Sequence, residues 1–294
     1  MATTRAAATY LAATLLVIPG AARRSDLVAQ PPTPAPDVFA FHTPIHLLGD
    51  ERVTFLAQAA ATRITLSYEL FKLTVQPGGA LTSTRASPVV QLKVCPGSGG
   101  DLACEQTLTA AFPDASLVRF DAIPEASSGA IGKKSYFFAA GSFPLPDAPI
   151  PLRQKTATTE AGLDVIFVPT AKLTIADLRD ALDGIIRDVY FRYAPIERAR
   201  GLYNFYYSPH AGNYDNEQFT DPVNMALLEA TGDAIVFLHR EPLRDMRLGK
   251  RISSEVAIRE KNLIHETGHV LFGLQDEYCC DSTYVPPELL SCVH

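Results

Sequence analysis

The chain has 294 residues, of which 47% are hydrophobic and 20% charged, the composition of a globular protein that buries a core. Its formal net charge of -6 comes from interspersed acidic and basic residues, which argues against a nucleic-acid-binding protein. A chain of this length folds as one large domain or as two of ordinary size.

The N-terminus has the pattern of a secretory signal peptide over residues 1–22. Arg5 supplies a positive start, an apolar run extends from Ala6 to Pro19, and small residues follow it. The apolar run is shorter than the roughly 20 residues that cross a bilayer. The pattern predicts a secreted protein with no membrane anchor in the mature chain. The alternative is a disordered, alanine-rich start on a cytosolic protein.

Residues 23–37 are a proline-rich stretch, which is typical of an extended linker. Residues 38–155 then contain short runs of β-branched and aromatic residues, separated by clusters of Gly, Pro and Ser. The runs predicted as strands are Arg52–Leu56, Arg63–Val75, Val89–Val94, Leu117–Phe120 and Lys134–Ala139. The pattern predicts an all-β, sandwich-like accessory domain.

All five cysteines follow the predicted signal peptide. Cys95 and Cys104 flank a flexible loop, so their side chains can meet in a disulfide. Cys279, Cys280 and Cys292 remain, and their odd number leaves either a free thiol or a partner outside this chain.

The pattern changes near residue 160, and residues 160–294 are predicted to form a second domain. Strands are expected at Leu163–Val168, Leu202–Tyr207 and Asp233–His239. Thr174 and Asp177 have the spacing of a capping box, which predicts a helix from this point to near Pro195. A last helix is predicted from Ser253 or Ser254 to about Leu274. This order of elements is typical of an α/β or α+β domain with its chemistry on the final helix.

That final helix carries the motif His265-Glu266-Thr267-Gly268-His269. Because each helical residue advances about 100°, His265 and His269 project from one face, one turn apart. Two imidazoles at this spacing can bind one Zn²⁺. Glu266 lies beside the first of them, where its carboxylate can accept a proton from a water molecule. We therefore predict a zinc site with Glu266 as its general base.

A third protein ligand is expected just after the motif. Gly273 lies where the helix would end in a left-handed turn, and Asp276 and Glu277 follow it. Asp276 is the first choice for the third ligand, and Glu277 is the alternative. The competing interpretation is that the histidines are ordinary helix residues and that the two carboxylates are solvated.

The run from His265 to Tyr278, with its later Gly-Leu-Gln-Asp-Glu-Tyr segment, resembles the bacterial IgA-peptidase family of zinc metallopeptidases. The resemblance implies a metzincin-like catalytic domain with an active-site helix, zinc, endopeptidase chemistry and a bacterial source. It makes His265, His269 and Asp276 the ligands and Glu266 the catalytic residue. No Met follows the motif to form the turn expected beneath the metal, so the catalytic domain is predicted to be incomplete at its C-terminal end.

Three functions follow from these residues. The first is a secreted, extracellular or periplasmic zinc endopeptidase that acts on protein or peptide substrates. The second is a secreted or surface binding protein with a structural or inactive zinc site. The third is a zinc hydrolase that cleaves a non-peptide amide.

Two further groups of residues are interpreted as packing, although each has a functional alternative: a place behind the metal ligands for the first, and the rim of a substrate cleft for the second. One is His239, at the end of a predicted strand. The other is an aromatic cluster with one histidine, made of Tyr203, Tyr206, Tyr207, His210 and Tyr214.

Overall fold

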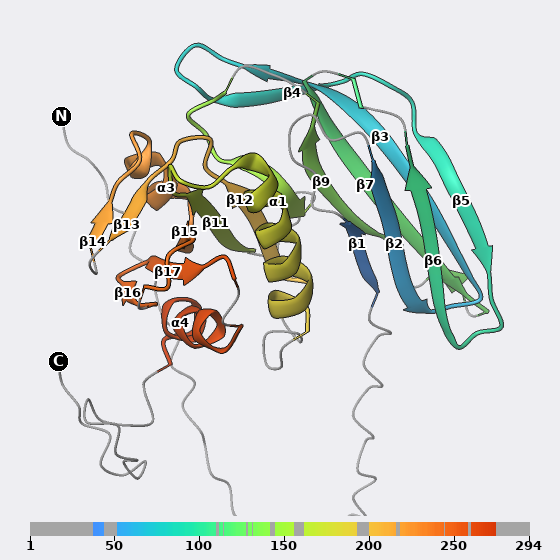
Figure 1. Cartoon of the computed structure of the whole chain (residues 1–294). Helices are drawn as coiled ribbons and strands as arrows, with labels where there is room; N and C mark the ends of the chain where they lie inside the picture. Colours follow the sequence, from blue (N-terminus) through green and yellow to red (C-terminus); the bar gives the residue numbers. More distant parts are fainter. Residues whose placement is uncertain are drawn as a thin grey trace, which may run out of the picture. The chain divides into compact units, whose positions relative to one another are not determined.

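Figure 1 shows the chain as a computed structural model. The structure describes residues 38–43, 52–109, 112–113, 115–127, 129–130, 132–141, 145–155, 162–192, 200–215, 218–243, 245–257 and 260–274. The predicted signal peptide and linker, the two carboxylates Asp276 and Glu277, and three of the cysteines lie outside these ranges.

The first part of the chain consists of strands. They are β1 (Phe39–Thr43), β2 (Val53–Ala60), β3 (Arg63–Val75), β4 (Leu81–Arg85), β5 (Val90–Pro96), β6 (Asp101–Leu108), β7 (Ser116–Ala126), β8 (Gly129–Ala130), β9 (Lys134–Ala140) and β10 (Ile150–Lys155). All five predicted runs are strands, and Arg63–Val75 has the predicted bounds. Side chains from the three-stranded sheet β1-β2-β6 pack against β3, β7 and β9 in a shared core that includes Phe55, Phe120 and Phe138.

The second part mixes strands with helical segments. In chain order these are β11 (Leu163–Pro169), α1 (Ile175–Gly184), the π-helix η1 (Ile185–Tyr190), β12 (Tyr203–Tyr207), β13 (Asn213–Asp215), β14 (Gln218–Thr220), α3 (Met225–Thr231), β15 (Ala234–His239), β16 (Arg247–Leu248), β17 (Arg251–Glu255) and α4 (Glu260–Phe272). The predicted strands near 163, 202 and 233 are confirmed. The capping box at the start of α1 is confirmed too, because Thr174 and Asp177 bond to each other's main-chain N–H groups.

The largest sheet joins the two parts of the chain. It has twelve strands in the described part of the chain. The main path follows the order β16-β17-β15-β11-β12-β10-β9-β7-β3-β4, while β5 pairs with β3 and β8 pairs with β7. Strand β10 makes the junction, since it pairs antiparallel with β9 on one side and with β12 on the other. Strands β12, β11, β15 and β17 are parallel to one another, whereas the other pairings in the sheet are antiparallel.

The predicted fold class is therefore wrong. We expected an α+β or α/β, metzincin-like catalytic domain behind an all-β, sandwich-like domain. In the described chain strands predominate, with α1, η1, α3 and α4 as its helical segments, and one mixed sheet runs through both parts. Residue patterns mark single strands but do not say which strands pair, so the link through β10 left no local signal. The boundary expected between residues 155 and 160 stays a prediction.

The bounds predicted for the last helix are wrong at its start. Ser253 and Ser254 lie in strand β17, which pairs in parallel with β15. Both serines are buried, and the Ser253 hydroxyl accepts a hydrogen bond from the main-chain N–H of Met246 at 2.9 Å. The Ser253 hydroxyl therefore supports a strand rather than caps a helix. The helix α4 begins at Glu260 and ends at Phe272.

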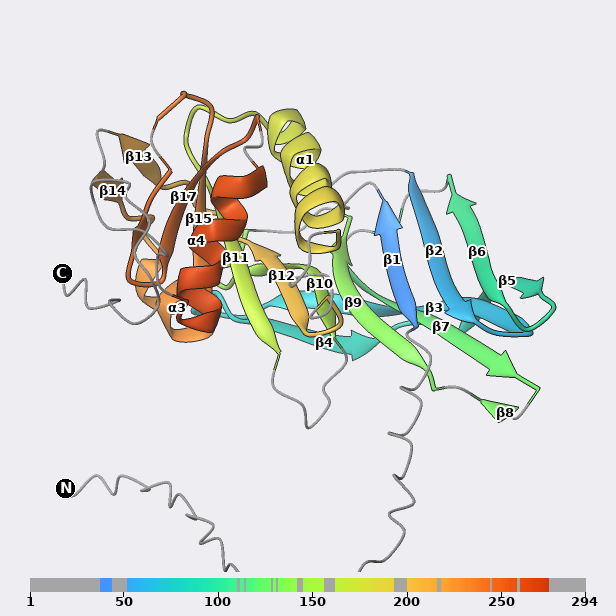
Figure 2. The ribbon, with the colours of Figure 1, turned by 90° about the horizontal axis from the view of Figure 1, so that it is seen from below.

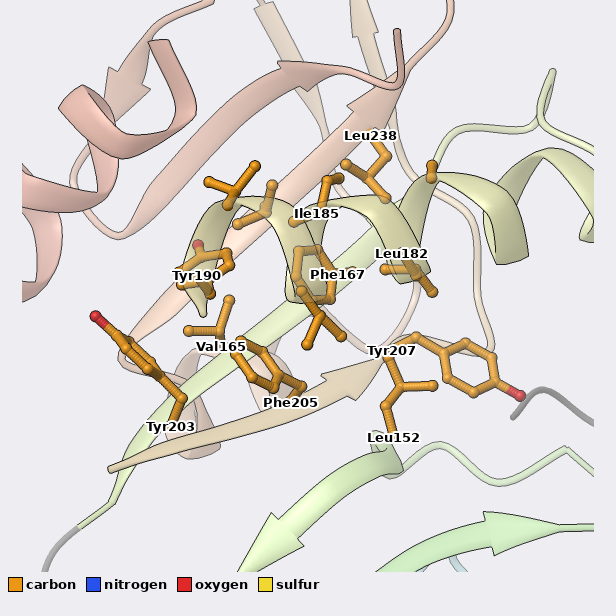
Figure 3. Close-up of a cluster of buried hydrophobic side chains, with 14 of the residues drawn as sticks. Leu152, Val165, Phe167, Leu182, Ile185, Tyr190, Tyr203, Phe205, Tyr207 and Leu238 are labelled. Atoms are coloured by element: carbon orange, nitrogen blue, oxygen red, sulfur yellow. The ribbon is translucent and has the colours of Figure 1, made fainter. Parts of the chain in front are cut away.

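Helices cover both faces of the parallel strands. Figure 2 shows α1 and α4 on one side of these strands. Residues Val165 and Phe167 of β11 face a core that contains Leu182 of α1 and Ile185 and Tyr190 of η1 (Figure 3), and Leu263 of α4 belongs to the same core. The intervening residues Ile166 and Val168 face α3 on the opposite side. This alternation follows from the two-residue period of a strand. The motif helix α4 therefore packs on the core formed by the Val165 and Phe167 side of the sheet.

Cys95 and Cys104 form the predicted disulfide, which joins β5 to β6. None of the helices in the described part of the chain has both the length and the apolar character needed to cross a membrane.

Candidate metal centre

The two motif histidines project from α4 toward each other. Their Nε2 atoms lie 3.0 Å apart, and the ring planes are 85° from parallel. His265 is exposed, Glu266 is half-buried beside it, and His269 is 8% exposed. The spacing of the motif thus produces the convergent imidazole pair that the sequence predicted.

The ring of His269 is held by the main chain that follows the helix. Its Nδ1 atom donates a hydrogen bond to the Leu274 carbonyl oxygen at 2.6 Å. A neutral imidazole has one N–H group, so this bond places the proton on Nδ1 and leaves a lone pair on Nε2. Metal-binding histidines are characteristically oriented by such a bond from the other ring nitrogen.

Two glycines make this hydrogen bond possible. Gly273 has a φ of +63°, a left-handed conformation that ends the helix and turns the chain back. The Leu274 N–H group then donates to the Gly268 carbonyl oxygen at 3.2 Å. A Cβ on Gly268 would lie 3.2 Å from the Leu274 side chain, which is tighter than ordinary packing. The glycine within the motif therefore makes room for the chain's own returning leucine.

The histidine pair supplies two of the nitrogen donors that a zinc site can use. Two nitrogen ligands that are each about 2.1 Å from a tetrahedral zinc lie about 3.4 Å apart, so the observed pair needs only a small ring rotation. Within the described ranges no His, Cys, Asp or Glu joins the pair to make a group of three metal ligands. Asp276 and Glu277, the two predicted candidates for the third ligand, lie outside those ranges.

The opposite face of α4 is anchored in the core. Thr267, between the two histidines, is fully buried, and its hydroxyl lies 3.1 Å from the hydroxyl of Tyr190 at the end of η1. Burial raises the pKa of Tyr190 well above its usual value, so this phenol stays neutral at physiological pH.

A buried carboxylate supports the first turn of α4. Asp245 accepts hydrogen bonds from the main-chain N–H of Glu255 at 3.3 Å and from the side-chain amide of Asn262 at 3.2 Å. His239 is fully buried beneath it, with Nδ1 donating to the Glu241 carbonyl oxygen and Nε2 at 3.6 Å from Asp245. His239 therefore belongs to the core, as interpreted from the sequence.

The aromatic cluster after β11 is also mainly packing. Tyr203, Tyr207 and Tyr214 are buried. His210 is half-buried, with its Nε2 atom 3.1 Å from a carboxylate oxygen of Asp147.

Sequence reasoning missed two residues next to the candidate centre. Tyr190 continues the apolar face of α1 into η1, so its sequence position marks it only as core. Asp245 lies between two short strands and carries no motif. Both contact α4 across long stretches of chain, 77 residues in the case of Tyr190 and Thr267.

No protein-family model and no curated protein matches the chain. Among solved structures, Spo0M, a sporulation control protein from Bacillus subtilis, is 12% identical over 37% of this chain and 50% of its own, with a TM-score of 0.24. An inactive mutant of a GH20 exo-β-N-acetylglucosaminidase from Vibrio harveyi is 10% identical over 75% of this chain and 34% of its own, with a TM-score of 0.13. The chain thus spans half of the first protein and about a third of the second, and similarity this low carries no argument about function.

Proposed function

We propose that this chain is a secreted zinc-dependent endopeptidase related to the bacterial IgA-peptidase family. The observation that carries the proposal is the pair of Nε2 atoms 3.0 Å apart, with the ring of His269 fixed from behind by the Leu274 carbonyl. In the proposal His265 and His269 are zinc ligands. Asp276 is the third ligand, with Glu277 as the alternative.

The turn at Gly273 supports a third ligand from the segment just beyond α4. By Leu274 the chain has already folded back against the helix, where its main chain contacts Gly268 and His269. Asp276 follows only two residues later. Its carboxylate would complete the three protein ligands that are usual for a catalytic zinc.

Glu266 is the proposed acid/base. Bound zinc would supply a Lewis acid that lowers the pKa of water and polarises a carbonyl group. The carboxylate of Glu266 accepts the proton of the attacking water and returns it to the nitrogen of the leaving amine. Glu266 is half-buried and follows the exposed His265 directly.

Secretion is part of the proposal, from the signal-like residues 1–22. The Cys95–Cys104 disulfide supports it, because such bonds persist in oxidising compartments. Protein or peptide substrates are the proposed partners.

The test is zinc analysis combined with a casein or peptide cleavage assay on the wild type, Glu266→Gln and His265→Ala. We expect about one zinc per chain in the wild type and in Glu266→Gln, because glutamine keeps the shape of the side chain. Cleavage by Glu266→Gln should fall by about 100-fold or more, since proton transfer is lost. His265→Ala should lose its zinc. Glu105→Gln, on the exposed surface of β6, is the matched control and should behave as the wild type.

The outcomes separate the competing functions. A wild type that binds no zinc contradicts the proposal. Zinc without cleavage of any peptide identifies a structural or inactive site, or an enzyme for a non-peptide amide. For the third ligand, Asp276→Ala should lose more zinc than Glu277→Ala, and equal retention rejects the assignment of Asp276.

A further inference from the structure

The buried face of α4 carries a polar residue at the centre of the motif. Thr267 follows His265 by two residues and precedes His269 by two, so it lies about 200° around the helix from each. It is fully buried, while His265 is exposed. The contact that Thr267 makes in the core is therefore on the side of α4 opposite to the metal ligands.

That contact is the hydroxyl of Tyr190, at 3.1 Å. Tyr190 is the last residue of η1 and is itself fully buried. Its ring is held edge-on by Tyr203 and Phe205, each with a ring centroid 5.2 Å away, as Figure 3 shows for this layer of the core. A π-helix is a rare departure from the α-helix and occurs often at functional sites. Here it ends in the phenol that meets α4.

The helix α4 also packs on this core through the apolar side chains of Leu263, Ile264, Val270 and Leu271. Apolar contacts have little directional preference, so they allow small rotations of a helix. A hydrogen bond depends strongly on angle and distance. The hydrogen bond between Tyr190 and Thr267 therefore restricts the rotation of α4 at the level of the motif, as the bond between Asp245 and Asn262 does at the first turn of the helix.

Rotation of α4 matters for a metal site at its surface. Side-chain atoms about 6 Å from the helix axis move by about 2 Å when the helix turns through about 20°. Such a movement displaces both histidines relative to every group outside the helix, including a third ligand and a substrate. Metal sites tolerate errors of only about 0.2 Å in ligand distance.

We propose that Tyr190 is a positioning residue of the zinc centre, which it serves by fixing the rotation of α4 through its hydrogen bond to Thr267. This role rests on the proposed zinc site. Tyr190 touches neither metal nor substrate, and it acts through the helix alone.

The chain supplies variants that isolate this bond. Tyr190→Phe and Thr267→Val each remove one hydroxyl and keep the shape of the side chain, whereas Thr267→Ser keeps the hydroxyl. Tyr203→Phe is the matched control, because the Tyr203 hydroxyl is buried in the same layer and has no hydrogen-bond partner among the described residues.

The measurements are zinc affinity by chelator competition and the visible spectrum of the Co²⁺-substituted protein, which reports ligand geometry. Tyr190→Phe and Thr267→Val should each weaken zinc binding by about 10-fold and change the cobalt spectrum. The double variant should lose no more than either single one, since both remove the same bond. Thr267→Ser and Tyr203→Phe should stay within about 2-fold of the wild type.

The positioning role is overturned if Tyr190→Phe and Thr267→Val bind zinc as tightly as the wild type, or if Tyr203→Phe loses as much. If Tyr190→Phe does not fold, the comparison of Thr267→Val with Thr267→Ser tests the same hydrogen bond. A wild type without zinc refutes the proposed function and this role together. Zinc binding that none of these variants changes refutes the role alone.

Discussion

Arg153 is a buried cation that binds to main-chain and aromatic groups. Its guanidinium donates to the carbonyl oxygens of Tyr203 at 3.1 Å and Ala40 at 3.2 Å. It lies between the rings of Tyr136 and Phe191, 4.8 and 5.3 Å from their centroids. Burial lowers the pKa of Arg153, and these contacts stabilise the charge that burial disfavours. One side chain thus links β1 and β12 to β10.

Replacement of this residue should destabilise the protein without touching the candidate centre. Arg153→Met keeps an apolar stem but removes both hydrogen bonds, so we expect a loss of about 3 kcal/mol in the free energy of unfolding. Arg153→Lys keeps the charge but not the fork of donors, and its loss should be smaller. Urea denaturation measures both. A methionine variant within about 1 kcal/mol of the wild type would show that packing alone holds this junction.

At the scale of single elements, the N-terminus of α1 is stabilised by the ionised carboxylate of Asp177. The Thr174 hydroxyl is the main cause of a lowered pKa at Asp177, with further contributions from the Thr174 main-chain N–H group and from Arg240. Asp177 also forms an ion pair with Arg240, which follows β15. This carboxylate therefore favours the folded state in its ionised form.

The pH dependence of stability should report this carboxylate. A lowered folded-state pKa stabilises the protein above the unfolded-state value, near 3.8, and the contribution is lost as the pH falls through the folded-state value. The wild type should be more stable than Asp177→Asn at about pH 7, and the difference should shrink below about pH 4. Urea denaturation across this range measures it. A difference that does not depend on pH would mean that the charge of Asp177 has no part in the cap.

The sequence predicted those elements whose stabilising contacts lie between residues close together in the chain. The capping box at Thr174 was readable because both partners lie within one turn. The serines before α4 carried the same kind of signal, but the neighbouring strand β15 overrode it. The convergent histidines were predicted because four residues separate them. Tyr190 and Asp245 were not, since their contacts with α4 depend on how distant segments pack.

At the scale of the whole molecule, one core connects the two parts of the described chain. Phe41 and Leu73 belong to the same buried cluster as Phe167 and Phe205. The sheet is continuous across β9, β10 and β12. Damage to one part should therefore reach the other.

Phe120→Ala tests this coupling. Phe120 is fully buried between the two sheets of the first part, with its ring stacked 4.6 Å from that of Phe55. Its loss should cost about 3–5 kcal/mol. If the described chain unfolds as one unit, hydrogen exchange should become faster by the same factor in β15 as in β7. Faster exchange confined to β2, β3 and β7 would instead support residues 38–155 as a separate domain.

The hydrogen bond from His269 to Leu274 also has a mechanical consequence. The segment of chain that leaves α4 is tied to the imidazole ring by the Leu274 carbonyl group. A displacement of the main chain at Leu274 would therefore change the orientation of the ring as well as the end of the helix. The orientation of the His269 ring therefore depends on the position of the main chain at Leu274.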